Sequence, residues 1–269
     1  MKPFPGSGGK FPAFLKAAGE ASLIPVLVLV LWAAFSVAGV VNPYLIPSPA
    51  KVFSAAAELY RRGEFFGHLL VSLGRVWGGY GLSVSLALPS ALLFHFSPRL
   101  KRLFHGLLEF FRAVPPLAMI PLLILWFGIG EASKLAVIVL ATFFPVFLNA
   151  LGGFESIDGR WLELSRSLDL SLTRRLRYVL FPGALPQIIT GLRIGFGYGW
   201  RALLGAELFS SASGLGYLIT DAQEMARVDI VFVGIASIGF LGFSFDYLLR
   251  TLADAISPED EVRNWGIDG

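Results

Sequence analysis

Few residues of this chain have the types and spacing that enzyme chemistry requires. The 269 residues include no cysteine, which excludes a disulfide framework and a cysteine-based metal site. The three histidines, His68, His95 and His105, are scattered without the spacing of metal ligands. No G-x-x-x-x-G-K-[ST] loop is present to hold nucleotide phosphates. We therefore expect no enzyme activity, no metal and no bound cofactor. If the chain transports a solute, the energy must come from a partner or an ion gradient.

The charged residues that stand out lie inside long apolar runs. Arg193, Arg201 and Glu207 share one such run, and Arg75 lies at the start of another. Charges are costly in lipid and usually face protein or a water-filled cavity. We therefore expect Arg193 and Arg201 to face protein or water, with Arg201 a candidate for lining a translocation pathway.

The apolar runs themselves predict the fold. The chain is 55% hydrophobic and only 15% charged, which is too apolar for a soluble domain. About 20 apolar residues form a helix that crosses a bilayer core of about 30 Å. We predict an all-α, polytopic membrane protein with a transmembrane domain over 21–256 between tails at 1–20 and 257–269. Its six expected spans are about 21–41, 69–95, 107–128, 133–153, 186–208 and 229–250.

The first span follows three lysines and resembles the core of a secretory signal. It is too long for a usual signal core, and five further spans follow it. We interpret it as an uncleaved transmembrane helix.

The distribution of lysine and arginine predicts the orientation. One side of the six-span arrangement carries thirteen of these residues and the other carries five. Because positive residues accumulate in cytoplasmic loops, we expect both termini and the segment 154–182 to lie in the cytoplasm, with the chain in the inner cell membrane. Arg75 and Glu207 then lie toward the outer ends of their spans, where we expect them to form a structural ion pair.

Three prolines interrupt the third span, at Pro115, Pro116 and Pro121. Proline removes a backbone donor and clashes with the preceding turn. Broken helices at membrane depth are tolerated where they are buried in protein or line a cavity. The prolines and the nearby Trp126 are therefore candidates for the translocation pathway. The alternative is an ordinary kink.

Glycines recur every four residues in the fifth span, at Gly191, Gly195 and Gly199. A stripe of small residues lets two helices approach closely. Packing inside the chain is favoured over a dimer seam.

An amphipathic helix is predicted after the first span, with Ser48 or Ser54 as its N-cap. It either lies in the outer membrane interface or packs as a connector on the bundle.

The segment 163–186, ELSRSLDLSLTRRLRYVLFPGALP, is unusually basic for this chain. Its pattern predicts two short helices broken near residues 169–171, with Asp169 or Ser171 capping the second. The segment is either a helix that docks onto a partner or a solvated basic loop that satisfies the positive-inside rule.

At this point the sequence resembles a known family. Permeases of ATP-binding-cassette (ABC) importers carry a cytoplasmic loop of pattern E-A-A-x-x-x-G-x9-I-x-L-P. The present chain matches that spacing from Glu163 to Pro182, with Leu164 and Ser165 in place of the alanines and Asp169 in place of the glycine. Other stretches, among them "LIPSPAKV", "FFPVFLNALGG" and "SGLGYLI", are similar to the sulfonate/taurine/nitrate branch of these binding-protein-dependent permeases.

The resemblance implies a type I ABC importer permease-like bundle. It implies a homodimer in membrane lipid, ABC ATPase subunits that hydrolyse the ATP, and an extracytoplasmic solute-binding protein; nucleic acid is not expected. The residues expected to couple to the ATPase are Glu163, Leu164, Ser165, Arg166, Ser167, Leu168, Asp169, Ser171 and Pro182. The residues expected to contact the binding protein are Ser213, Gly214, Leu215, Gly216 and Tyr217.

The implied solute is small, such as a sulfonate, taurine, nitrate or bicarbonate. A thiamine-precursor pyrimidine or riboflavin is the alternative within the same machinery. An ion-coupled secondary transporter is the more distant alternative, because the halves show no internal repeat and the intramembrane charges are mainly arginines.

Overall fold

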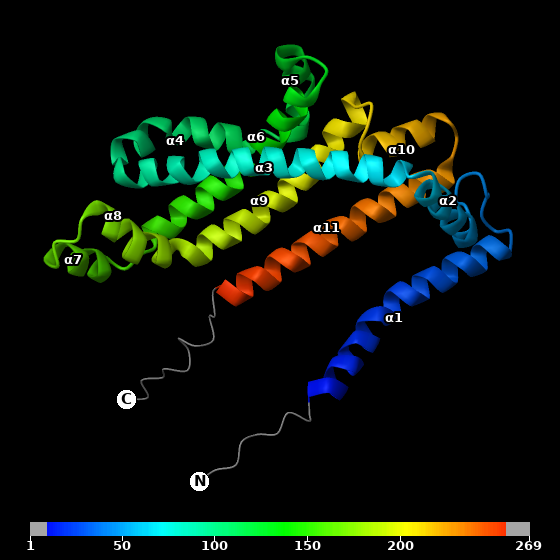
Figure 1. Ribbon diagram of the computed structural model, residues 1–269, viewed down its shortest axis with the longest axis horizontal. Helices are drawn as coiled ribbons and strands as arrows, with labels where there is room; N and C mark the ends of the chain where they lie inside the picture. Colours follow the sequence, from blue (N-terminus) through cyan, green and yellow to red (C-terminus); the bar gives the residue numbers. More distant parts are fainter. Residues whose placement is uncertain (1–9, 257–269) are drawn as a thin grey trace, which may run out of the picture.

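The computed structural model describes residues 10–256, and the side chains of residues 23–253. Every regular element in this range is helical. Helices α3 (Glu64–Phe96), α6 (Glu131–Glu155), α9 (Phe181–Ser210) and α11 (Val228–Ile256) form the bundle, in which α6 packs against both α3 and α9 (Figure 1). The remaining helical elements are α1 (Lys10–Val37), α2 (Pro49–Arg62), α4 (Pro98–Ala113), η1 (Pro116–Met119), α5 (Ile120–Phe127), α7 (Gly159–Ser167), α8 (Leu172–Arg175), η2 (Leu176–Leu180) and α10 (Leu215–Glu224).

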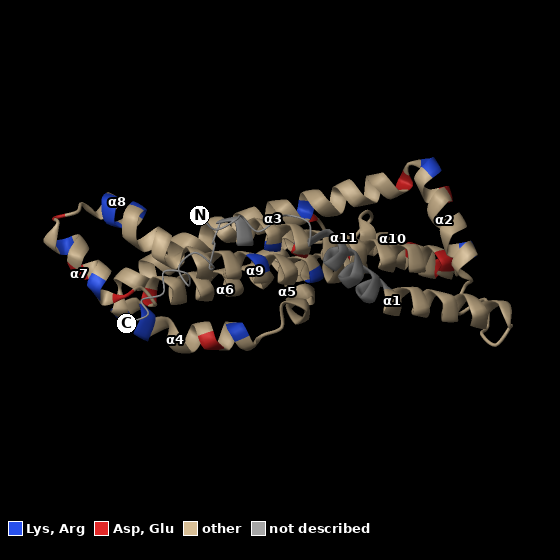
Figure 2. Cartoon of the chain, turned by 90° about the horizontal axis from the view of Figure 1, so that it is seen from below, with Lys and Arg blue, Asp and Glu red and all other residues tan. Residues whose placement is uncertain are grey.

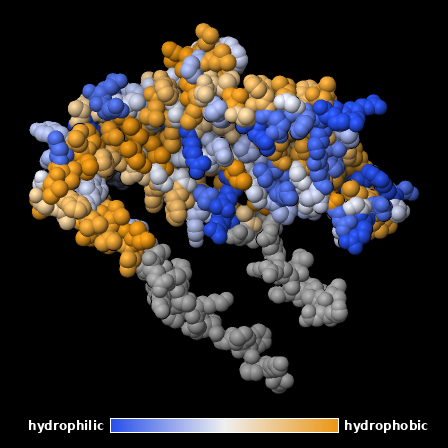
Figure 3. Space-filling model, turned by 180° about the vertical axis from the view of Figure 1, so that it is seen from behind, coloured by the Kyte–Doolittle hydropathy of each residue, from blue (hydrophilic) through white to orange (hydrophobic). Residues whose placement is uncertain are grey.

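The two ends of the bundle carry different short elements. Helices α7 and α8 lie at one end, and α2 and α10 lie at the other (Figure 1). Charged residues are frequent on the short helices at both ends, while the long helices between them are mostly uncharged (Figure 2). Figure 3 shows a mainly hydrophobic surface between the ends, interrupted by hydrophilic patches near the middle. This distribution is that of a bundle whose middle lies in lipid.

The all-helical prediction is confirmed, and the spans are partly matched. Four helical segments are long and apolar enough to cross a membrane, and a fifth is obtained if one bent pair is taken as one span. The described apolar part of α1, Leu23–Val37, is shorter than these. Helix α1 already begins at Lys10, inside the stretch expected to be a tail. Residues 1–9 and the expected tail 257–269 lie outside the described part of the chain.

The third expected span, 107–128, is not one continuous helix. Helix α4 ends at Ala113, and the direction of the chain turns by 89° before η1 and α5. Pro115 and Pro116 cause the break, because neither can donate a backbone hydrogen bond and a residue before proline is driven to an extended conformation. Val114 and Pro115 are extended accordingly, with ψ of 121° and 124°. As a result α5 projects sideways from the middle of the bundle (Figure 1).

The fifth span also differs at its start. Helix α9 begins at Phe181 rather than near Pro186, so Pro182 lies in its first turn and Pro186 inside it. A π-helical turn, η2, leads directly into α9, and its last bond runs from the Phe181 N–H to the Leu176 carbonyl. This turn immediately precedes Pro182, which has no backbone N–H to donate to the preceding turn. The chain is therefore helical without interruption from Leu172 to Ser210.

The glycine stripe of α9 packs inside the chain, as predicted. A methyl group built on Gly191, Gly195 or Gly199 would lie 2.6, 2.7 or 2.5 Å from a side-chain atom of α6. The contacted residues of α6 are Asn149, Val146 and Thr142. The close approach also lets the Thr142 hydroxyl donate a hydrogen bond to the Gly195 carbonyl at 3.3 Å. Helices α6 and α9 thus form the tightest pair of the bundle.

We expect Gly195→Ala to destabilise the protein by about 1–3 kcal/mol, because the added methyl group overlaps Val146 in a packed interface. Gly197→Ala is the matched control, since Gly197 lies on the same helix with no atom within 4 Å of an added methyl group. The control should be neutral or slightly stabilising, since alanine favours helix over glycine by about 1 kcal/mol. Thermal unfolding in detergent distinguishes the two, and equal melting temperatures would contradict the packing argument.

Helix α2 connects α1 to α3 at the end of the bundle opposite α7 (Figure 1). Ser48 is its N-cap, accepting a hydrogen bond from the Lys51 N–H at 3.3 Å, so of the two expected caps Ser48 is the one used. Ala55 and Leu59 are buried in a cluster with Leu218 and Val233. Because one face of α2 is packed on α10 and α11, the connector interpretation describes it better than a helix lying free in the interface.

Candidate functional site

The first candidate site is the turn formed by α7 at the end of the bundle. Asp158 is the N-cap of α7 and accepts a hydrogen bond from the Arg160 N–H at 2.9 Å. The Arg160 guanidinium donates two further bonds to the same carboxylate, at 2.8 and 2.6 Å. These bonds hold the pKa of the Asp158 carboxyl below its usual range. Asp158 therefore stays charged at neutral pH, as a capping carboxylate at the positive end of a helix should.

The end of α7 is set by Asp169. The Leu170 N–H donates to the Ser165 carbonyl at 3.1 Å, and the Asp169 N–H donates to the Arg166 carbonyl at 3.0 Å. This pair of bonds is a Schellman motif, in which the residue after the C-cap adopts the left-handed conformation. Asp169 does so, with φ of 47°. The glycine of the family pattern is thus replaced by a residue that keeps the same backbone turn.

The structure places an exposed apolar surface on α7. Trp161, Leu164 and Leu168 are 61%, 47% and 62% exposed. Their spacing of three and four residues puts them on one side of the helix. Trp161 was not among the residues expected from the sequence, although its spacing from Leu164 and Leu168 was the available signal. We refer to Trp161, Leu164 and Leu168 as the α7 knob.

The other residues expected to couple to the ATPase differ in their exposure. Glu163, Arg166 and Ser167 are exposed, whereas Ser165 is buried and donates to the Leu162 carbonyl at 2.7 Å. Ser171 occupies the N-cap position of α8, without a capping hydrogen bond from its side chain. Ser165 therefore supports the turn from inside, while Pro182 is exposed in the first turn of α9, and the exposed residues are the ones available to a partner.

We expect Asp169→Gly to stabilise the turn, because glycine adopts the left-handed conformation without the steric cost that aspartate bears. Asp169→Val should destabilise it, since a β-branched residue is strongly disfavoured there. The measurement is protease cleavage within 158–172 in the purified protein, with slower cleavage expected for the glycine variant and faster cleavage for the valine variant. The same cleavage rate in both variants would contradict the assignment of the left-handed turn.

The second feature is a buried polar network that holds the end carrying α10. The Arg75 guanidinium donates to the Glu207 carboxylate at 2.8 Å and to Glu131 at 2.6 and 2.7 Å. Glu207 also accepts from the Ser72 hydroxyl at 2.8 Å and from the Gly216 N–H at 2.9 Å. Arg75 and Glu207, which were expected to pair, are thus in direct contact. The network joins α3, α6 and α9 to the start of α10.

The residues expected to contact a binding protein lie largely inside this network. Gly214, Leu215 and Gly216 are buried, and their N–H groups donate to His68, Ser72 and Glu207. Ser213 and Tyr217 are half-buried. In this conformation the three buried residues do not reach a separate protein. Ala212 is exposed just before them, and Gln223, Glu224, Met225 and Ala226 are exposed at the end of α10.

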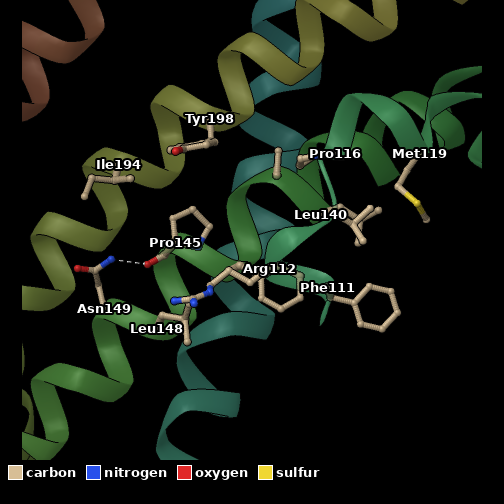
Figure 4. Close-up of a pocket in the computed structure, with 13 residues that line it drawn as sticks. Phe111, Arg112, Pro116, Met119, Leu140, Pro145, Leu148, Asn149, Ile194 and Tyr198 are labelled. Atoms are coloured by element: carbon tan, nitrogen blue, oxygen red, sulfur yellow. Dashed lines mark hydrogen bonds between the residues drawn. The ribbon is translucent and has the colours of Figure 1, made fainter. Parts of the chain in front are cut away.

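Three cavities are lined in part by α9, and the third, of about 340 Å³, combines Arg193, Arg201 and Asp246 with apolar residues of α9 and α11. The first has a volume of about 260 Å³ and is lined mainly by apolar residues of α4, α6 and α9 (Figure 4). The second, of about 540 Å³, is lined by Arg193, Arg201 and Asp246. Pro116 lines the first cavity and Arg201 the second. Pro115, Pro121 and Trp126 are exposed and line none of the three cavities.

No cluster of three metal-ligating side chains occurs among the residues that the structure describes. The geometry thus offers a docking turn at one end and a charged helix face at mid-length.

Comparison with known proteins points to one family. The family model described as "Binding-protein-dependent transport system inner membrane component" matches residues 79–258. The chain is 36% identical to the putative aliphatic sulfonates transport permease protein SsuC of Bacillus subtilis, over 86% of this chain and 83% of the relative. It is 35% identical to the taurine transport system permease protein TauC of Escherichia coli, over 86% of each chain.

Solved structures support the same fold at lower sequence identity. An amino acid ABC transporter crystallised with histidines is similar over 74% of this chain and 97% of that chain, with a TM-score of 0.62 and 18% identity. The MetNI methionine ABC transporter in an inward-facing conformation is similar over 69% of this chain and 93% of that chain, with a TM-score of 0.60 and 16% identity. At this identity the likeness shows the fold alone.

Proposed function

The chain belongs to the family of inner-membrane components of binding-protein-dependent transport systems, and on this premise we propose that it moves a small organosulfonate or a similar anion into the cell. As a member of this family it is a permease subunit of an ABC importer. The observation that carries the choice of solute is the similarity, over most of the chain, to relatives named for aliphatic sulfonate and taurine transport. The arginines that face the cavity of α9 support an anionic solute.

The α7 knob is the proposed contact with the ATPase subunit. It is exposed, it is apolar, and it is flanked by charged Glu163 and Arg166, which suits a groove with polar edges. The uninterrupted helix from Leu172 to Ser210 connects it to α9. Because α9 is locked to α6 through the glycine stripe, a displacement of the docked turn moves both helices together.

The remaining assignments follow the distribution of charge and exposure. The end carrying α7 and α8 is proposed to face the cytoplasm with both termini, in accordance with its excess of arginine. The exposed end of α10 and helix α2 are then the surface offered to a binding protein. A homodimer would cover the projecting helix α5, whose Leu125, Trp126 and Phe127 are exposed and apolar.

The test is uptake by the complete transporter, reconstituted in lipid vesicles with its ATPase and binding protein. We expect ATP-dependent accumulation of taurine or an alkanesulfonate, and none when the ATPase carries an inactivating substitution in its nucleotide site. Accumulation of a pyrimidine or riboflavin without any sulfonate would replace the solute proposed. Uptake that persists without ATP would contradict the proposed mechanism.

A further inference from the structure

One face of α9 carries polar and charged residues at helical spacing through the middle of a long apolar helix. Thr190, Arg193, Gly197 and Arg201 lie on this face, with Ile194 and Tyr198 between them. The opposite face is the glycine stripe that packs on α6. Eight residues separate the two arginines, which corresponds to about 12 Å along a helix. Both therefore lie in the central part of this 30-residue helix.

Of the three cavities along α9, those of about 260 and 540 Å³ differ in chemistry. The smaller one is lined by aromatic and aliphatic side chains, among them Phe111, Leu140, Phe144 and Leu148, and its one charged lining residue is Arg112, which pairs with Glu109 at 2.5 Å. The larger one is lined by the charged residues of α9 and α11. Ile194 and Tyr198, which Figure 4 shows on the α9 side of the smaller cavity, line both cavities, so the two are adjacent at these side chains.

Among the described side chains of the larger cavity, the positive charges outnumber the negative ones. Asp246 of α11 accepts two hydrogen bonds from Arg193, at 2.8 and 2.9 Å, and so neutralises that guanidinium. The Arg201 guanidinium lies 6.0 Å from the centre of the Tyr198 ring. Among the described side chains, no carboxylate forms an ion pair with Arg201. Among the described side chains that line this cavity, two guanidiniums face one carboxylate, and Arg201 lies one helical turn from Tyr198, which also lines the apolar cavity.

Resting on the proposed function, we propose that these two cavities form one divided site for an amphiphilic anion. Arg201 binds the sulfonate group, and the cavity lined by Phe111, Leu140, Phe144 and Leu148 receives the alkyl chain. Tyr198 and Ile194 lie between the two halves and fix the solute's orientation. The volume of about 260 Å³ lies below the usual range of drug-sized pockets, which suits a short chain.

The test compares uptake of ethanesulfonate and hexanesulfonate by the complete transporter in phosphatidylcholine vesicles. Arg201→Gln is expected to lower the uptake of both by about tenfold or more, because a charge-assisted bond to the anion is lost. Arg201→Lys should restore part of it. Leu148→Phe, which reduces the apolar cavity, should lower hexanesulfonate uptake by about tenfold and ethanesulfonate uptake by less than about twofold. Arg99→Gln, at an exposed arginine of α4, is the control and should leave both unchanged.

The outcomes separate this inference from the proposed function. If the wild-type transporter moves neither sulfonate, the proposed solute is wrong and the divided site falls with it. If the wild type moves both and Arg201→Gln does so at the same rate, only the divided site is wrong. Anionic lipid is the other source of an anion for Arg201. Two results together would also overturn the divided site. The wild-type transporter would take up sulfonate only when anionic lipid is added, and wild type and Arg201→Gln would not differ in phosphatidylcholine vesicles. Co-elution with the ATPase confirms that each variant is folded, and Arg201→Lys and Leu148→Phe carry the test if Arg201→Gln fails to assemble.

Discussion

Replacing Leu168 with aspartate is expected to abolish stimulation of the ATPase by the solute-loaded binding protein, while leaving the permease folded. Leu168 is 62% exposed and contributes little to the packing of the bundle, so the change should not unfold the chain. In the docked state the same side chain would be enclosed by the ATPase. Burying a leucine contributes about 1.5–3 kcal/mol, and burying an unpaired carboxylate adds a cost of several more. Since a homodimer would use two such contacts, we expect a loss of at least about 100-fold in stimulated activity.

The measurement has two parts, co-purification of the ATPase with the permease and ATPase rate with and without the solute-loaded binding protein. Leu45→Asp is the matched control, since Leu45 is similarly exposed at 69% and lies in the segment between α1 and α2, at the opposite end of the bundle. We expect the control to keep the ATPase bound. Trp161→Asp should resemble Leu168→Asp, because both residues belong to the α7 knob. Normal coupling in both knob variants would refute the docking surface.

The sequence predicts where the α7 knob lies in the chain, but not which of its side chains are exposed. Spacing alone placed a break near residues 169–171, and the structure has α7 end at Ser167 with Asp169 in the left-handed conformation. The sequence does not say which side of a nine-residue helix is covered. Ser165 is buried and Trp161 exposed because α7 packs on the core of the bundle through its own Leu162, together with Leu176 of η2. This is a tertiary contact that periodicity in so short a helix cannot reveal.

For the long helices too, the sequence predicts where the helices lie but not the tertiary contacts between them. Uncharged runs located α3, α6, α9 and α11, because lipid requires apolar helices of a minimum length. Composition could not show that Pro115 and Pro116 turn the chain by 89°, since proline fixes local dihedral angles and neighbouring helices set the direction that follows. Nor could it show that Gly214, Leu215 and Gly216 are buried. Their N–H groups donate hydrogen bonds to His68 and Ser72, which are more than 140 residues away in sequence, and to Glu207, which is nine residues away.

A large loss of stability is expected when the buried polar network around Arg75 and Glu207 is broken. Glu207 is 1% exposed and Arg75 is 6% exposed. Removing one member of a buried ion pair leaves the other charged and without its partner, which costs about 3–5 kcal/mol. We therefore expect Arg75→Ala to destabilise the protein by this amount and to free the turn at 211–214, because the Arg75 guanidinium also donates to the Ser213 carbonyl at 2.6 Å. Thermal unfolding of the purified permease measures the first effect, and protease cleavage near 211–214 measures the second.

The partners of Arg75 allow the contribution of each carboxylate to be separated. Glu131 is largely exposed, at 60% of its side chain, so Glu131→Gln should cost no more than about 1 kcal/mol. Glu207→Gln keeps the shape and a hydrogen-bonding oxygen but removes the charge that neutralises buried Arg75, and it should cost several times more than Glu131→Gln. The double variant Arg75→Met with Glu207→Leu should be more stable than Arg75→Ala, because neither charge remains buried without the other. If Glu207→Gln leaves stability, assembly and transport intact, the ion pair has no structural role, and the bonds from Arg75 to Ser213 and from Gly214 to His68 suffice to hold the turn at 211–214.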